Sequence, residues 1–225
     1  MQTFNPNKYG LSFHTTTPQL GICLSNFVDD NRSQVWDLGR DLSVYLHKSL
    51  GEILQPQTWQ DLQFIAVAKG PGGFTGTRIG VVAARTLSQQ VNIPLFGISS
   101  LAAVALDYVK TNREISSESN NFNDCLLAVQ MKARQEQLFV AIYQFVSKDN
   151  SLQTYIADTI MTLEEWQKTL ANLDRSYQLI EAPNNLANTV PCVLELAYQQ
   201  WQTGKLTTWQ EVVPFYGQNP VNSSR

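Results

Sequence analysis

Two patterns of apolar and polar residues alternate along the chain: short apolar runs, and longer stretches with an apolar residue every three or four positions. The first pattern is typical of strands and the second of amphipathic helices. In the first half they predict, in order, strands at residues 8–14, 19–27 and 33–39, a helix that opens at 39–41 and ends near 54, a strand at 64–68, a helix at 76–90, a strand at 95–98 and a helix capped by Ser99 or Ser100. Three strands followed by alternating helices and strands favour a mixed sheet with helices on its faces.

The second half repeats this order in a weaker form. It predicts strands at residues 125–131, 137–146 and 152–160, a helix from Thr162 to Leu173, a strand at 177–181, a helix at 190–202 and an apolar docking tail at 212–216. The polar stretch Thr111–Asp124 is the best boundary between two lobes. We therefore expect an α/β protein with a first lobe at residues 1–110 and a second lobe at 111–225, with the last helix or the tail free to pack back on the first lobe.

The stretch Phe64–Ser100 is the most informative part of the chain, because a glycine-rich turn joins its strand to its helix. Gly70, Gly72 and Gly73 allow close backbone approach, and Thr75 is expected to cap the helix. The turn is neither a Walker A motif, since no Lys precedes a Ser or Thr, nor a GxGxxG motif. Backbone N–H groups at a helix N-terminus suit an anion, so these four residues form a possible phosphate-facing turn. A tight structural turn is the alternative.

The helix after this turn carries only small side chains on one face. Gly76, Gly80, Ala84 and Ser88 recur every four residues, so they line one side of the helix. A glycine in a helix interior costs about 1 kcal/mol relative to alanine, so a packing or binding reason is expected. Two interpretations remain open: tight packing on the protein's own sheet, or a surface for a partner or a ligand.

Composition and charge narrow the function classes. Apolar residues make up 43% of the chain and charged residues 16%, and the net charge is −3, which is typical of a globular protein. Because the sequence has no cluster of basic residues, the chain is not expected to bind nucleic acid by itself. Cys23, Cys125 and Cys192 form no CxxC pair, which favours reduced thiols. The chain shows neither a signal peptide nor a membrane-spanning stretch, so a cytoplasmic location without membrane contact is expected.

No set of residues with catalytic spacing emerges from the chain. His14 and His47 form no metal-binding pair and no GxSxG motif is present, so neither catalytic nor metal-ligating residues are predicted. The arginines at 78, 85 and 134 are open between a solvated position and an ion pair with a partner.

The segment GPGGFTGTRIGVVAARTLSQQVNIPLFGISSLAAVA, residues 70–105, resembles the signature of the bacterial TsaB (YeaZ) family. That signature consists of a GPGSFTG-type turn, an RIG step, a small-residue helix and an SSLEAL segment. Residues 132–143 (KARQEQLFVAIY) and 212–217 (VVPFYG) resemble the hairpin and the C-terminal ending of the family. The resemblance implies a two-lobed actin-like ATPase fold, of the sugar kinase, Hsp70 and actin type, in which each lobe is a mixed sheet with a βββαβα-type core.

The resemblance also implies a function and partners. Family members take part in making N6-threonylcarbamoyladenosine at position 37 of tRNA, as non-catalytic scaffolds. They pair with the paralogous transferase subunit TsaD, the small ATPase TsaE joins them, they form homodimers, and tRNA is reached only through the complex. No cofactor is expected to bind tightly, although ATP or ADP could lie at the complex interface. The partner interface is expected to comprise Leu42, Tyr45, Leu46, Leu50, Gly76, Gly80, Ala84 and Ser88.

Three positions depart from the family pattern. The first strand ends in His14 where the family usually has an Asp, Lys132 replaces the Asp of the hairpin, and residues 39–43 (Gly-Arg-Asp-Leu-Ser) replace an Arg-x-His-Ser-Glu step. The missing carboxylate removes the obvious ligand for Mg²⁺ with a nucleotide. Two other functions stand as alternatives: a glycoprotease-type metallopeptidase, which would need paired histidines, and a stand-alone nucleotide-binding switch that holds a phosphate at residues 70–76.

Overall fold

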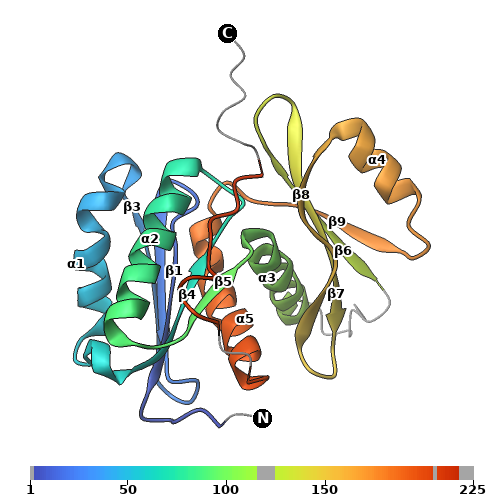
Figure 1. Ribbon diagram of the computed structural model, residues 1–225. Coiled ribbons are helices and arrows are strands. Elements are labelled where there is room, and N and C mark those ends of the chain that lie inside the picture. Colours follow the sequence, from blue (N-terminus) through green and yellow to red (C-terminus); the bar gives the residue numbers. More distant parts are fainter. Residues whose placement is uncertain (1–2, 116–124, 205–206, 218–225) are drawn as a thin grey trace.

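Two mixed β-sheets stand side by side, with helices between them and on their outer faces (Figure 1). The computed structural model describes residues 3–115, 125–204 and 207–217. The first sheet has the strand order β3-β2-β1-β4-β5. Its strands are β1 (Tyr9–His14), β2 (Gln19–Ser25), β3 (Asn31–Asp37), β4 (Leu62–Ala68) and β5 (Leu95–Ile98). The first three run antiparallel, and β1, β4 and β5 run parallel.

The second sheet repeats this order without the last strand, as β8-β7-β6-β9. Its strands are β6 (Leu126–Lys132), β7 (Gln137–Val146), β8 (Ser151–Thr162) and β9 (Tyr177–Glu181). Again three antiparallel strands come first, and β9 joins β6 in parallel. The α/β class with two mixed sheets of βββαβ order is therefore confirmed.

The helices divide the protein into layers. On one face of the first sheet lie α1 (Leu42–Leu54) and α2 (Phe74–Val91), and on its other face lies α5 (Val190–Gln202). Between the sheets lies α3 (Ser100–Ile115), and α4 (Leu163–Ala171) covers the outer face of the second sheet. Short 3₁₀ turns, η1 (Gly39–Asp41), η2 (Trp59–Asp61) and η4 (Leu186–Thr189), precede α1, β4 and α5. None of the helices within the described residues is long and apolar enough to cross a membrane.

Successive side chains of a strand point to opposite faces of the sheet, and this explains the layers. In β4, Phe64, Ala66 and Ala68 face the core that α3 and α5 share with the second sheet, while Ile65 and Val67 face α1 and α2. All five side chains are fully buried, as expected for a parallel strand that is covered on both faces. The shared core is the larger one, and it contains residues from both sheets.

The predicted elements all form, with shifts of a few residues at their ends. The helix predicted at 76–90 begins earlier, at Phe74, with Gly73 in the N-cap position. The prediction that Thr75 caps this helix is therefore wrong, because Thr75 lies inside the first turn. The predicted boundary at 111–124 begins inside α3, which extends to Ile115, and residues 116–124 lie outside the described part of the chain.

Candidate functional site

The small face of α2 packs on the end of β1, within the same chain. Thr15 is fully buried, and its Oγ1 donates a hydrogen bond to the carbonyl oxygen of Gly76 at 2.8 Å. A Cβ at Gly76 would overlap the Thr15 carbonyl oxygen, and one at Gly80 would overlap the Thr15 hydroxyl. Ala84 and Ser88 are buried as well. Of the two interpretations left open by the sequence, packing on the protein's own sheet accounts for these four residues.

The leucines of the predicted interface are also internal. Leu42, Leu46 and Leu50 on α1 are buried in the core between α1, α2 and the first sheet, and among the predicted α1 residues only Tyr45 is exposed. The prediction that these leucines and the small face of α2 themselves meet a partner is thus corrected, because their side chains are already packed. An interface on these two helices stays a prediction, and it would involve other side chains.

The outward side of α1 and α2 exposes several apolar side chains. Val44 and Tyr45 on α1 are 69% and 42% exposed, and Phe74 and Val82 on α2 are 39% and 53% exposed. Arg78 is also exposed, midway between Phe74 and Val82, so the three form one stripe at four-residue spacing. Both helices lie next to each other on the same face of the first sheet (Figure 1). We call Val44, Tyr45, Phe74 and Val82 the outer helix face.

Two other arginines singled out in the sequence have different surroundings. The Arg85 guanidinium lies over the ring of Trp209, 5.4 Å from its centroid, so it stacks on this chain's own C-terminal segment. Arg134 is exposed in the β6–β7 hairpin, as is Lys132. The exposed position of Arg134 is compatible both with a solvated side chain and with an ion pair to a partner.

The glycine-rich turn is closed by residues of its own chain. Gly70 has a φ of +105°, and a Cβ there would overlap the carbonyl oxygen of Phe215. The Gly73 N–H donates to the carbonyl oxygen of Thr16 at 2.7 Å, and Gly72 lies against the same threonine. Because an N–H that is already bonded is not free for an anion, this arrangement favours the structural turn over the phosphate-facing turn.

His14 lies at the end of β1 and is fully buried. Its Nδ1 is 3.4 Å from both the N and the Oγ1 of Thr16, while its Nε2 has no hydrogen-bond partner among the residues that the structure describes. Burial lowers the pKa of His14 to about 3, so the ring is neutral near pH 7. A neutral ring in place of a carboxylate does not fit a magnesium–phosphate group. The described residues contain no group of three or more His, Cys, Asp or Glu side chains that could hold a metal ion.

A polar cluster joins the two lobes beside the glycine-rich turn. The Ser99 Oγ caps α3 by accepting from the N–H groups of Leu101 and Ala102, and it donates to Asp158 Oδ1 at 2.7 Å. The Tyr143 hydroxyl donates to the same carboxylate oxygen at 3.1 Å. Burial raises the pKa of Asp158, while these hydroxyl groups and the nearby Lys69 ammonium counteract the shift.

Sequence reasoning found the Ser99 cap but missed Asp158 and Tyr143. The only signal was a charged residue inside a strand of otherwise alternating character. Their meeting with Ser99 depends on how the second sheet lies against the N-terminus of α3, which local patterns do not encode.

Comparison with known proteins finds relatives that are named for tRNA modification. Residues 40–198 match the family described as "TsaD: tRNA N6-adenosine threonylcarbamoyltransferase". A Bacillus subtilis protein named "tRNA threonylcarbamoyladenosine biosynthesis protein TsaB" is 35% identical over 116 residues, which are 52% of this chain and 44% of that protein. A protein of the same name from Buchnera aphidicola (subsp. Acyrthosiphon pisum) is 26% identical over 57% of this chain and 53% of its own length. The chain thus spans about half the length of these relatives.

Solved structures agree with this placement at the level of the fold. The structure described as "YeaZ from Pseudomonas aeruginosa" aligns with a TM-score of 0.69 and 18% identity, covering 93% of this chain and all of that one. A second Pseudomonas aeruginosa structure, of "an uncharacterized protein with similarity to peptidase YEAZ", aligns with a TM-score of 0.71 and 16% identity, covering 94% of this chain and all of that one. The chain therefore belongs to the family matched over residues 40–198. Its TsaB-named relatives, together with a fold shared with YeaZ, confirm the resemblance seen in the sequence.

Proposed function

We propose that this chain is a non-catalytic scaffold subunit for the formation of N6-threonylcarbamoyladenosine in tRNA, and that it acts by pairing with the transferase subunit TsaD. The names of its relatives support the pathway. The observation that carries the scaffold role is the outer helix face, where four large apolar side chains stay exposed on two adjacent helices. Exposed apolar side chains that gather in one region are typical of interaction sites.

The predicted helices keep their role in this proposal. Tyr45 stays in the expected interface, and Val44, Phe74 and Val82 take the place of the buried residues. The buried leucines of α1 and the small face of α2 hold both helices on the first sheet, so the helices present a rigid outer side. Val44 and Tyr45 would contact the partner from α1, and Phe74 and Val82 from α2. The same face would serve in a homodimer, because identical surfaces can meet around a two-fold axis.

A non-catalytic role is supported by the chemistry at the C-terminal end of β1. The neutral His14 ring and the turn closed by Thr16 leave this chain without an obvious way to bind and activate a nucleotide phosphate. ATP or ADP would then bind at the interface with TsaD, and TsaE would join there, rather than on this chain alone.

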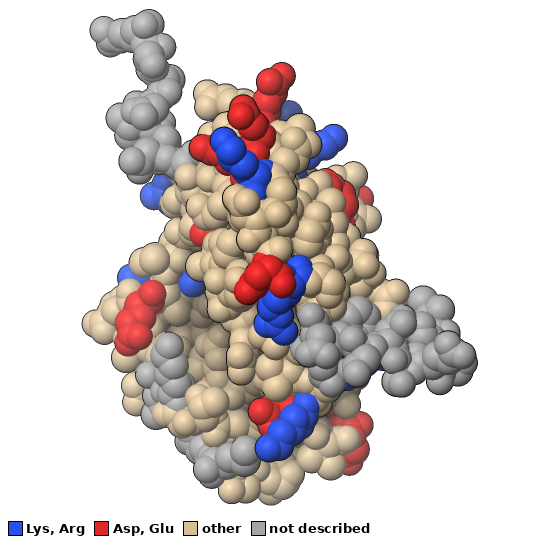
Figure 2. Space-filling view, turned by 90° about the vertical axis from the view of Figure 1, so that its right-hand side faces the viewer, with Lys and Arg blue, Asp and Glu red and all other residues tan. Residues whose placement is uncertain are grey.

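Contact with tRNA would be indirect, through the other subunits. The net charge of −3 is unfavourable for phosphate binding. Figure 2 shows the side of the molecule that bears the second sheet, where blue and red groups lie close together over the described surface instead of forming a single basic patch. A role in tRNA modification is compatible with a cytoplasmic location.

The test is association with the TsaD subunit, measured by sedimentation. We expect Val82→Glu to weaken the pairing about tenfold or more, because a charge would have to be desolvated in the interface. The matched control is Val28→Glu, at a valine that is 67% exposed in the turn between β2 and β3. The control is expected to pair normally.

Two results would contradict the proposal. If Val82→Glu pairs as well as the control, the outer helix face is not the interface. If the unmodified chain stays apart from TsaD both with and without nucleotide and TsaE, the scaffold role itself is wrong.

A further inference from the structure

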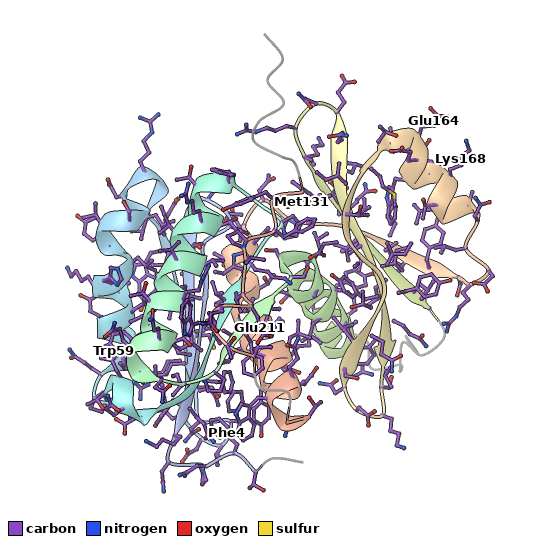
Figure 3. All side chains as sticks on the ribbon, in the orientation of Figure 1. Phe4, Trp59, Met131, Glu164, Lys168 and Glu211 are labelled. Atoms are coloured by element: carbon purple, nitrogen blue, oxygen red, sulfur yellow. The ribbon has the colours of Figure 1, made fainter. Side chains whose placement is uncertain are left out.

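The C-terminal segment, residues 207–217, runs through the middle of the protein between the two lobes, where Figure 1 draws it in red and Figure 3 labels Glu211 on it. We call it the strap. It begins beside β5, where the Leu95 N–H donates to the Thr207 carbonyl oxygen at 3.2 Å. Further along, Val212 is 4% exposed and is buried in the core of the first lobe. The strap is thus anchored on the first lobe before it reaches the second.

The far end of the strap contacts both lobes at the glycine-rich turn. On the first lobe, the Phe215 N–H donates to the Lys69 carbonyl oxygen at 2.7 Å, and the ring centroids of Tyr216 and Phe74 lie 4.4 Å apart. On the second lobe, the ring centroids of Phe215 and Phe139 lie 6.5 Å apart. These contacts come from the residue after β4, from α2 and from β7, so this short stretch touches both sides of the lobe boundary.

Three glycines make room for the strap. A Cβ at Gly97 would lie 2.8 Å from Val212 Cγ1, and one at Gly70 would overlap the Phe215 carbonyl oxygen. Gly217 itself has a φ of +63°, and a Cβ there would lie 2.6 Å from Ile160 Cδ1 on β8. Glycine at each of these positions removes the side chain that would push the strap away from one lobe or the other.

We propose that the strap is a latch that locks the two lobes together at the glycine-rich turn. The lobes already share the core around α3 and α5, and Phe215 of the strap and Ile160 of β8 pack against this core. The strap joins them at the turn, next to the Ser99–Asp158 hydrogen bond. The strap thus adds a backbone hydrogen bond and packed side chains that span both lobes. The chain itself would then hold the lobes in one relative orientation without a bound nucleotide.

The test is a distance measurement between the lobes of the full-length chain. Spin labels are placed at Lys48→Cys on α1 and Lys168→Cys on α4, two exposed lysines, of which Lys168 points outward from the second lobe in Figure 3. Cys125, which is partly exposed, is replaced by Ser, while the two buried cysteines remain. The latch variant carries Phe215→Pro, which lacks the N–H for Lys69, and Gly217→Leu, which collides with Ile160.

We expect the latch variant to have a distance distribution about twofold wider than that of the unmodified chain, or a second maximum, because the lobes sample more orientations. The matched control is Gly39→Leu, which also puts leucine at a positive φ (+52°). Among the described residues, the new Cβ there would meet no heavy atom within 4 Å beyond its chain neighbours, so its distribution should stay narrow. Each latch substitution is also made singly, in case the pair impairs folding. A distance distribution as narrow as that of the unmodified chain overturns the proposal. In the variant, neither the hydrogen bond to Lys69 nor the close contact of residue 217 with Ile160 can form.

Discussion

Thr15 determines the role of the small side chains on α2. It is buried at the end of β1 and bonds to Gly76, which lies 61 positions later in the chain. The glycines at 76 and 80 each leave room for atoms of this one residue. Their cost in helix propensity is therefore offset by close packing of the helix on its sheet.

Gly76→Ala is expected to destabilise the protein by about 1–3 kcal/mol, because the new Cβ would overlap a backbone carbonyl oxygen that cannot rotate away. Gly51→Ala, on α1, is the control. Among the described residues, its added Cβ would meet no heavy atom within 4 Å beyond its chain neighbours and the backbone of its own helix. This change should therefore stabilise by about 0.5–1 kcal/mol through helix propensity. Urea unfolding of both variants measures the two effects. A neutral Gly76→Ala would contradict the close packing on Thr15.

His14 makes stability depend on pH. Burial lowers its pKa from the ordinary 6.5 to about 3, so between these values the unfolded chain binds a proton that the folded chain does not. The contribution of His14 to the unfolding free energy is fully present above pH 6.5 and decreases as the pH falls towards 3. At pH 5 the unfolding free energy is lower by about 2 kcal/mol, because each pH unit below 6.5 costs about 1.4 kcal/mol.

His14→Gln should remove this loss. We expect the difference in unfolding free energy between pH 7.5 and pH 5 to shrink by about 2 kcal/mol relative to the unmodified chain. His47→Gln, at an exposed position on α1, should leave most of the difference in place. Equal pH dependence in the His14 variant and the unmodified chain would show that this ring titrates normally in the folded protein.

At the scale of elements, α2 has two different faces. Its inner face is made of small residues that fit around Thr15, and its outer stripe of Phe74, Arg78 and Val82 stays in contact with solvent. A helical repeat of small residues was visible in the sequence. The pattern alone does not say whether such a face meets the same chain or another one, because both need close approach.

The N-terminus of α3 combines a cap with a bond between the lobes. Ser99→Ala removes both, since its hydroxyl accepts from α3 and donates to Asp158. We expect a loss of about 2–3 kcal/mol in unfolding free energy, from a lost cap and a partly buried carboxylate that loses a donor. Thr162→Ala, in the exposed capping box of α4, should cost about 1 kcal/mol. Equal losses by urea unfolding would mean that the bond to Asp158 adds nothing.

At the scale of the whole molecule, two segments of the second half return to the first lobe. Helix α5 covers the face of the first sheet opposite α1 and α2, and the strap reaches the glycine-rich turn. The Lys110 ammonium of α3 pairs with the Glu195 carboxylate of α5 at 2.6 Å. The two halves of the sequence are thus two sheets, but the packed units are not separate halves of the chain.

The order and type of the elements follow from local patterns, because apolar periodicity, capping residues and proline or glycine breaks act over a few residues. The stretch at residues 70–105 was enough to indicate the family. Local patterns do not say which neighbour each face meets: Thr15 against the small face of α2, Thr16 and Phe215 against the glycine turn, and Asp158 against Ser99. These contacts join residues that are distant in the chain, and their geometry is set by how the two sheets and the strap pack together. For that reason the predicted interface leucines are core residues, and the exposed side chains next to them are the ones available to a partner.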